Sequence, residues 1–317
     1  ALLRPKSILS LLLLAIAFLM PVISESSYYQ SLFVITFIWI IVNQGFNIIL
    51  GYTGYASLVQ GGLFGMAAYV TAILSATYEV NVWISAIIAV IVIGVVSFLL
   101  ALVVFRTYGH FFAILTLVMS LVLYDLYCNL TITNGTIGIS GVPSLFPVSW
   151  PALTFYYFVL FIMLVSIAFV IWLRKTRLGY SMKGIGANEK LAASVGISHY
   201  SYKTAALVIS SLFAAVAGVL YAYFMTYVSP APFGITASLS MLIAVVIGGT
   251  GTVLGPILGS ILLVFLPAYL QSFQDYQLTI YGLACILIIR FMPRGLVSIG
   301  DYLKPRKTNV KMKQKTM

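Results

Sequence analysis

Long apolar runs, separated only by short polar segments, follow one another along most of this chain. A helix needs about 20 consecutive apolar residues to cross the hydrocarbon core of a bilayer. Only 7% of the residues are charged and 62% are apolar, so a water-soluble domain of 317 residues could not cover its surface. The sequence therefore predicts an all-α fold, a polytopic transmembrane helical bundle. The runs lie at about residues 8–24, 31–50, 56–78, 83–105, 111–130, 153–173, 204–224, 236–250, 254–271 and 277–292.

The bundle is predicted to form one domain over residues 1–303. The opening run follows Arg4 and Lys6 as in a signal peptide, but no A-x-A-like cleavage site comes after it, so we interpret it as a retained first span. The remaining residues, 304–317, form a basic tail with no apolar face. We expect this tail to be disordered and to contact anionic lipid headgroups at most.

Positive charges gather at the flanks of the apolar runs and in the segments between them. Lys and Arg concentrate near the N-terminus, at Arg106, in the segment 174–203 and from Arg290 onward. Alternating spans place all these segments on one face, as the positive-inside rule requires of the cytoplasmic side. Both termini are therefore predicted to be cytoplasmic. This placement also argues against nucleic acid as the partner of the net charge of +11.

Two Gly-rich signatures of the form G-x-T-G interrupt apolar runs in corresponding halves of the chain. Irregular backbone is tolerated at membrane depth where protein packs around it or where it lines a cavity, so paired breaks are typical of a transporter's substrate path. The alternative is that the glycines only permit close helix packing. The short runs 236–250 and 254–271 fit either a re-entrant hairpin or two broken spans. The glycines of the breaks are Gly51, Gly54, Gly248, Gly249, Gly251 and Gly255.

Polar side chains close to these breaks are the candidates for a solute path. Each of them has the alternative role of a hydrogen bond between helices, which contributes about 0.6 kcal/mol in membranes. The candidates are Asn43, Gln44, Asn47, Thr53, Ser57, Gln60, Thr116, Thr250 and Thr252.

The sequence lacks the devices of an enzyme. It contains no phosphate-binding G-x-x-x-x-G-K-[ST] loop, no dinucleotide-type turn, no nucleophile elbow and no cluster with metal-ligand spacing. We therefore expect no catalytic residue, no metal and no cofactor on this chain. Asp125 is the one acidic residue plainly inside a run, whereas ion-coupled carriers usually hold ionisable groups in their spans. The energy for transport is thus expected from another chain, and an autonomous carrier or channel remains the alternative.

The segment 174–203 contains a short predicted helix that starts near Asn188 and stops at Gly196, a favoured residue after a helix C-terminus. Here the chain resembles the permeases of ABC importers, whose cytoplasmic coupling loop has an acidic residue, alanines and a later glycine. Other segments are similar, in order, to permeases of the branched-chain amino-acid importers, and in particular to their M type. These segments are Asn47–Gly54, Ser57-Leu58, Phe64–Tyr69, Gly109–Leu117, Thr133–Ile139, Arg177–Gly179, Gly248–Pro256 and Met292–Leu296.

The resemblance implies a permease subunit that imports branched-chain or hydrophobic amino acids across a prokaryotic inner membrane. It implies a second permease, two cytoplasmic ATPases that hold the ATP, and an extracytoplasmic solute-binding protein. It also implies a coupling loop that includes Arg177, Glu189, Ala192, Ala193 and Gly196. Many members carry a glutamate where this chain has Leu121, which leaves urea or short amides open as the solute.

Overall fold

The computed structural model describes residues 18–21, 26–107, 109–146, 153–270, 282, 290 and 295–298. The predicted spans 8–24 and 277–292 lie mostly outside the described residues, and the basic tail 304–317 lies entirely outside them.

Among the described residues, five helices are long and apolar enough to cross a membrane. Every backbone polar group in lipid must be bonded within the protein, and a helix achieves this within one segment. The chain is therefore a multi-pass membrane protein, as its composition predicted. The five helices are α2 (Ser27–Thr53), α4 (Val82–Val104), α5 (His110–Asn129), α6 (Leu153–Leu173) and α9 (His199–Met225).

Three further helices flank the Gly-rich segments. The first is α3 (Gln60–Ala72), which continues into the π-helix η1 (Ile73–Thr77). The helix starts four residues later than the predicted run 56–78, because Gly54 ends α2 in a left-handed conformation and the backbone stays irregular up to Val59. The other two helices are α10 (Ile235–Gly248) and α11 (Leu254–Leu270).

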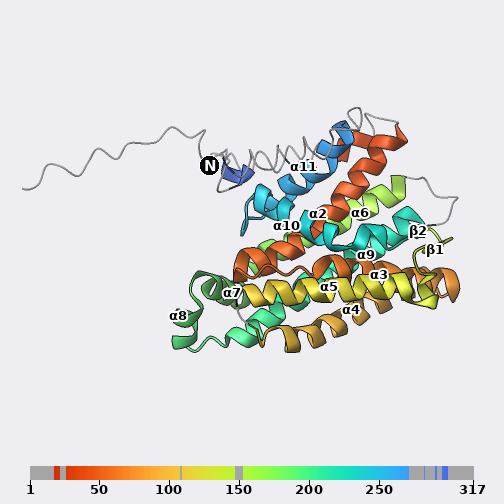
Figure 1. Cartoon of the computed structure of the whole chain (residues 1–317). Helices are drawn as coiled ribbons and strands as arrows, with labels where there is room; N and C mark the ends of the chain where they lie inside the picture. Colours follow the sequence, from red (N-terminus) through yellow and green to blue (C-terminus); the bar gives the residue numbers. More distant parts are fainter. Residues whose placement is uncertain are drawn as a thin grey trace, which may run out of the picture.

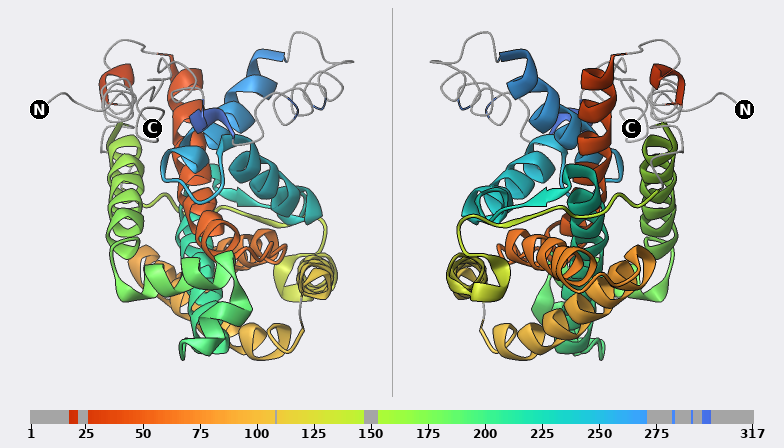
Figure 2. Two further views of the ribbon diagram at one scale, coloured as in Figure 1. Left: turned by 90° about the vertical axis from the view of Figure 1, so that its left-hand side faces the viewer. Right: turned by 90° about the vertical axis from the view of Figure 1, so that its right-hand side faces the viewer.

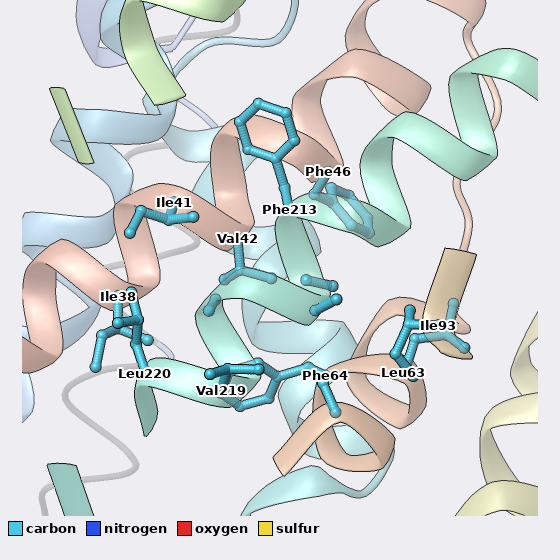
Figure 3. Close-up of a cluster of buried hydrophobic side chains, with 14 of the residues drawn as sticks. Ile38, Ile41, Val42, Phe46, Leu63, Phe64, Ile93, Phe213, Val219 and Leu220 are labelled. Carbon is cyan, nitrogen blue, oxygen red and sulfur yellow. The ribbon is translucent and has the colours of Figure 1, made fainter. Parts of the chain in front are cut away.

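The core of the molecule lies between α2 and α9. These two helices pack against each other, and α9 also contacts α3 and α4. In Figure 2, α6 and α5 lie on opposite sides of this central pair. Phe46 of α2, Phe64 of α3 and Phe213 of α9 belong to the buried cluster shown in Figure 3. Outside this core, α4, α5 and α6 keep broad exposed apolar faces, which suits contact with lipid or with another membrane protein.

The two ends of the bundle differ. At one end, β1 (Ile139–Ser140) pairs antiparallel with β2 (Tyr227–Val228). At the opposite end lie α7 (Arg177–Ala187) and α8 (Glu189–Ser194) (Figure 1). The remaining short elements are η2 (Thr131–Thr133), η3 (Ala231–Phe233) and η5 (Leu296–Ser298).

Candidate functional site

The two Gly-rich breaks touch each other through their backbones. A Cβ on Gly51 would overlap the backbone nitrogen of Gly251, and a Cβ on Gly251 would lie 3.1 Å from the carbonyl oxygen of Gly51. Gly251 also has a φ of +73°, which favours glycine. The contact joins segments about 200 positions apart in the sequence, so the breaks form one site.

Three amides of α2 hold the second break in place. Asn47 Oδ1 accepts a hydrogen bond of 2.8 Å from the Gly251 N–H, and Asn47 Nδ2 donates one of 2.8 Å to the Thr252 carbonyl. Gln44 Nε2 donates to the Val253 carbonyl over 2.8 Å, and Asn43 Nδ2 donates to Ser260 Oγ over 2.8 Å. The bonds of Asn47 and Gln44 satisfy backbone that the break removes from helix bonding, and the bond of Asn43 joins α2 to α11. Asn43, Gln44 and Asn47 thus make contacts between helices, the alternative role considered for them.

Contacts within the second break also hold its backbone in place. The Thr252 hydroxyl donates to the Gly249 carbonyl over 2.8 Å and accepts from the Gly255 N–H over 3.0 Å. A Cβ on Gly248 would overlap the carbonyl of Gly255, so α10 and α11 approach with no side chain between them. Thr250, another candidate for the path, is exposed.

Side chains of α5 and α10 border the first break. Thr116 Oγ1 of α5 accepts from the Leu58 N–H over 3.1 Å. Ser238 Oγ of α10 accepts from the Gly61 N–H over 3.0 Å and donates to the Leu58 carbonyl over 2.7 Å. Ser238 was not among the predicted residues, although its position inside an apolar run was a signal for it. Thr53 bonds within its own helix, to the Ile49 carbonyl over 2.6 Å.

Several buried polar atoms without a hydrogen-bond partner lie around the start of α3, and Asn43 Oδ1 and Gln44 Oε1 of α2 are two others among the described residues. Ser57 Oγ, both amide atoms of Gln60 and Ser120 Oγ are buried without a hydrogen-bond partner among the described residues. Gln60 is only 1% exposed. Ser120 of α5 lies beside the first turn of α3, since a Cβ on Gly62 would be 3.4 Å from its Cα. Buried polar groups in proteins are normally bonded, so these atoms are available to a bound molecule or water. Ser57 and Gln60 are among the candidates predicted from the sequence, and Ser120 is not.

The predicted coupling segment folds as two helices. Thr176 caps the start of α7, and Asn188 caps the start of α8 by accepting from the Leu191 N–H over 3.1 Å. Gly196 follows α8 with a φ of +81°, as its predicted role after the helix requires. Arg177 is exposed at the start of α7. Sequence reasoning treated the part before Asn188 as loop and missed α7.

The outer side of α8 is exposed and partly apolar. Leu191 is 64% exposed and Val195 is 70% exposed, whereas Ala192 is buried and Ala193 is exposed. Glu189, the first residue of α8, bonds to Tyr55 Oη and Lys203 Nζ of the same chain. Burial opposes ionisation of this carboxyl, but the hydrogen bonds from Lys203 and Tyr55 outweigh it and lower the pKa of Glu189 below its usual range.

Helix α7 packs directly on the end of α2. A Cβ on Gly186 would overlap the carbonyl oxygen of Tyr52, and a Cβ on Gly54 would lie 3.9 Å from the Gly186 Cα. Lys183 Nζ lies 4.8 Å from the centre of the Tyr52 ring. The described part of the chain therefore contains an unbroken series of backbone contacts. It runs from α7 to the first break, and from the first break at Gly51 to the second.

Relatives of this chain carry out membrane transport. A family model for the permease component of branched-chain amino acid transport systems matches residues 28–289. The chain is 31% identical over 290 residues to the high-affinity branched-chain amino acid transport system permease protein LivM of Escherichia coli (strain K12), covering 83% of this chain and 68% of LivM.

Matches to two other permeases are shorter. Identity to LivH of the same organism is 28% over 136 residues, covering 42% of this chain and 44% of LivH. Identity to a tyrosine transport system permease protein of Clostridioides difficile (strain R20291) is 30% over 146 residues, covering 44% of this chain and 48% of that protein. No solved structure matches the chain. The family match and the long alignment with LivM show that this chain belongs to the permease components of branched-chain amino acid transport systems, on the M side of the pair.

Proposed function

We propose that this chain is the M-type permease subunit of an ATP-driven importer for branched-chain or other hydrophobic amino acids. Its partners would be an H-type permease, two cytoplasmic ATPases that bind the ATP, and an extracytoplasmic solute-binding protein, with lipid around the bundle. The observation that carries the proposal is the series of contacts from α7 through Gly186 and Tyr52 to the first break, and from Gly51 to Gly251. Coupling between distant sites requires such a contiguous physical connection.

In this proposal, α7 and α8 are the element that the ATPases move. They lie together at one end of the bundle and outside its long helices (Figure 1). Leu191 and Val195 offer an apolar surface there, and Arg177 and Lys190 add exposed positive charge. This end would be cytoplasmic, together with both termini. Pressure on α7 would reach the two breaks through backbone contacts that no flexible side chain can absorb.

The solute path would pass the start of α3. Ser57, Gln60 and Ser120 have unpaired polar atoms there, and Thr116 and Ser238 border the same segment. The N-terminal end of a broken membrane helix carries partial positive charge, which suits the carboxylate of an amino acid. Asn47 and Gln44 would shape the path by fixing the second break, and Asn43 by holding α11, while Asn43 Oδ1 and Gln44 Oε1 keep unpaired oxygens beside it.

The test is uptake by the complete transporter in liposomes that hold ATP inside and receive binding protein and labelled leucine outside. We expect uptake to fall strongly in Gln60→Leu, which removes the unpaired amide, and to persist in the matched control Gln30→Leu, at a half-buried position in the first turn of α2. Competition by excess urea instead of excess isoleucine would show a different solute. Unchanged leucine uptake in Gln60→Leu would place the path elsewhere.

A further inference from the structure

Three polar groups meet beside the first break, and each contacts the other two. Lys203 Nζ lies 2.5 Å from Glu189 Oε1 and donates a hydrogen bond of 2.7 Å to Tyr55 Oη. The Tyr55 hydroxyl donates in turn to Glu189 Oε2 over 2.8 Å. Lys203 Nζ also lies 4.2 Å from the centre of the Tyr55 ring, within reach of a cation–π interaction.

The three residues come from three separate elements. Tyr55 belongs to the first break, Glu189 begins α8, and Lys203 lies near the start of α9. The edge-on contacts of the Tyr55 ring with Phe105 and Phe112, at 6.2 and 5.0 Å between ring centres, extend the cluster to the end of α4 and the start of α5. The cluster therefore connects α8 with the region in which the solute path was placed.

The two charged side chains of this pair differ in how deeply they are buried. Lys203 is 2% exposed, whereas Glu189 is 31% exposed. A lysine is almost never fully buried unless it is paired, so the position of Lys203 depends on Glu189 staying where it is. Glu189 itself remains partly within reach of water, so movement of α8 away from Lys203 would hydrate the carboxylate but leave the ammonium buried without it. The Glu189 carboxylate already bonds to Lys203 and Tyr55 of its own chain.

We propose that Glu189, Lys203 and Tyr55 form a latch that holds α8 on the first break and transmits its movement to that break through Tyr55. Glu189 is then a positioning residue inside the permease, and the surface that meets the ATPase consists of other residues of α7 and α8. This inference rests on the proposed role of α7 and α8 as the coupling element.

The test compares Glu189→Gln, Lys203→Met and the charge exchange Glu189→Lys with Lys203→Glu in the complete transporter. Lys175→Met, at an exposed lysine in the turn between α6 and α7, is the matched control. The readouts are hydrogen exchange of residues 188–197, co-purification of the ATPases, and ATP hydrolysis with and without leucine-loaded binding protein. Hydrogen exchange reports the latch itself and does not depend on the ATPases.

We expect both single variants to speed exchange in α8 on the order of tenfold or more. They should also lose most of the stimulation of ATP hydrolysis while the ATPases still co-purify, and the charge exchange should restore part of both properties. Loss of ATPase binding in Glu189→Gln with normal behaviour of Lys203→Met would overturn the latch, because Glu189 would then contact the ATPase. Unchanged exchange in both single variants would overturn it as well. A wild-type chain that never co-purifies with ATPases would refute the proposed function, and the exchange measurement would still decide whether the latch exists.

Discussion

The contact between Gly51 and Gly251 leaves no room for a side chain on α2. A Cβ on Gly51 would meet the nitrogen of Gly251 and lie 2.8 Å from its Cα, and backbone atoms cannot rotate away as a flexible side chain would. We therefore expect Gly51→Ala to separate the breaks and to abolish most uptake while the protein still inserts. Gly94→Ala is the control, since a Cβ there would only touch Leu212 at 3.4 Å. The measurement is uptake per amount of inserted protein, and full uptake in Gly51→Ala would show that the contact is dispensable.

Gly54 and Gly251 should respond to substitution differently from Gly51. Both have a left-handed φ, of +77° and +73°, which costs a residue with a Cβ roughly 1–2 kcal/mol. Space remains around Gly54, where the nearest atom would be 3.9 Å away, so Ala should be tolerated better than Leu. The Leu variants should impair uptake and leave insertion intact. Normal uptake in both Leu variants would mean that the repeated break is incidental.

Asn47 carries two bonds to the backbone of the second break. Asn47→Leu would leave the Gly251 N–H and the Thr252 carbonyl unpaired, and each such loss costs about 1–3 kcal/mol when the group is buried. We expect a lower melting temperature in detergent together with reduced uptake. The control is Asn129→Leu, whose exposed amide donates to the nearby Asp125 carbonyl. Equal melting temperatures of the two variants would contradict this role of Asn47.

Helix α8 offers a way to disturb coupling without disturbing the bundle. Gly196 has a φ of +81°, and no atom would lie within 4 Å of a Cβ there, so Gly196→Val adds backbone strain of about 1–2 kcal/mol and no clash. The variant should insert and pair with the second permease but lose ATPase association or solute-stimulated ATP hydrolysis. Lys313→Ala in the tail is the control. Normal assembly and stimulated turnover in Gly196→Val would show that α7 and α8 are not the coupling element.

Local patterns in the sequence predicted the elements well and their contacts poorly. The predicted run 83–105 corresponds to α4, the run 153–173 to α6, and the stop at Gly196 to the end of α8, because length, hydropathy and capping act within one segment. The start of α3 at Gln60 and the existence of α7 were missed. The packing of Gly51 on Gly251 joins residues that share no local signal, so no single-sequence pattern predicts it.

The contacts of Lys203, a charged residue, could not be predicted from the sequence either. Positive charge in the segment 174–203 predicted only the cytoplasmic side for these residues, and Arg177 is exposed. Lys203 instead is 2% exposed and bonded to Glu189 and Tyr55. A positive-inside count gives the side of the membrane on which a lysine lies. It contains no information on which carboxylate the tertiary fold brings to that lysine.

The molecule has two chemically different ends, and each should be accessible from one side of the membrane. Glu79 to Asn81 precede α4 at the end opposite to α7 and α8, where the described residues include no Lys or Arg. In a chain without Cys128 and Cys285, a cysteine at Val80 should react with an impermeant reagent from outside and one at Val195 only from inside. Lys or Arg added at 79–81 should be tolerated poorly, and additions in 304–317 should be harmless. Labelling of both cysteines from one side would refute the topology.

The chain by itself should neither hydrolyse ATP nor transport. Its sequence has no phosphate-binding loop, and α7 with α8, the proposed coupling element, exposes the apolar side chains of Leu191 and Val195. The broad exposed apolar faces of α4 and α5 likewise leave room for the second permease. Liposomes that contain only this chain should therefore show no concentrative uptake of leucine under a proton, sodium or electrical gradient, whereas the complete transporter should import leucine with ATP. Gradient-driven accumulation of leucine by the chain alone would favour an autonomous carrier. A permease subunit that depends on ATPases for its energy cannot concentrate a solute without them.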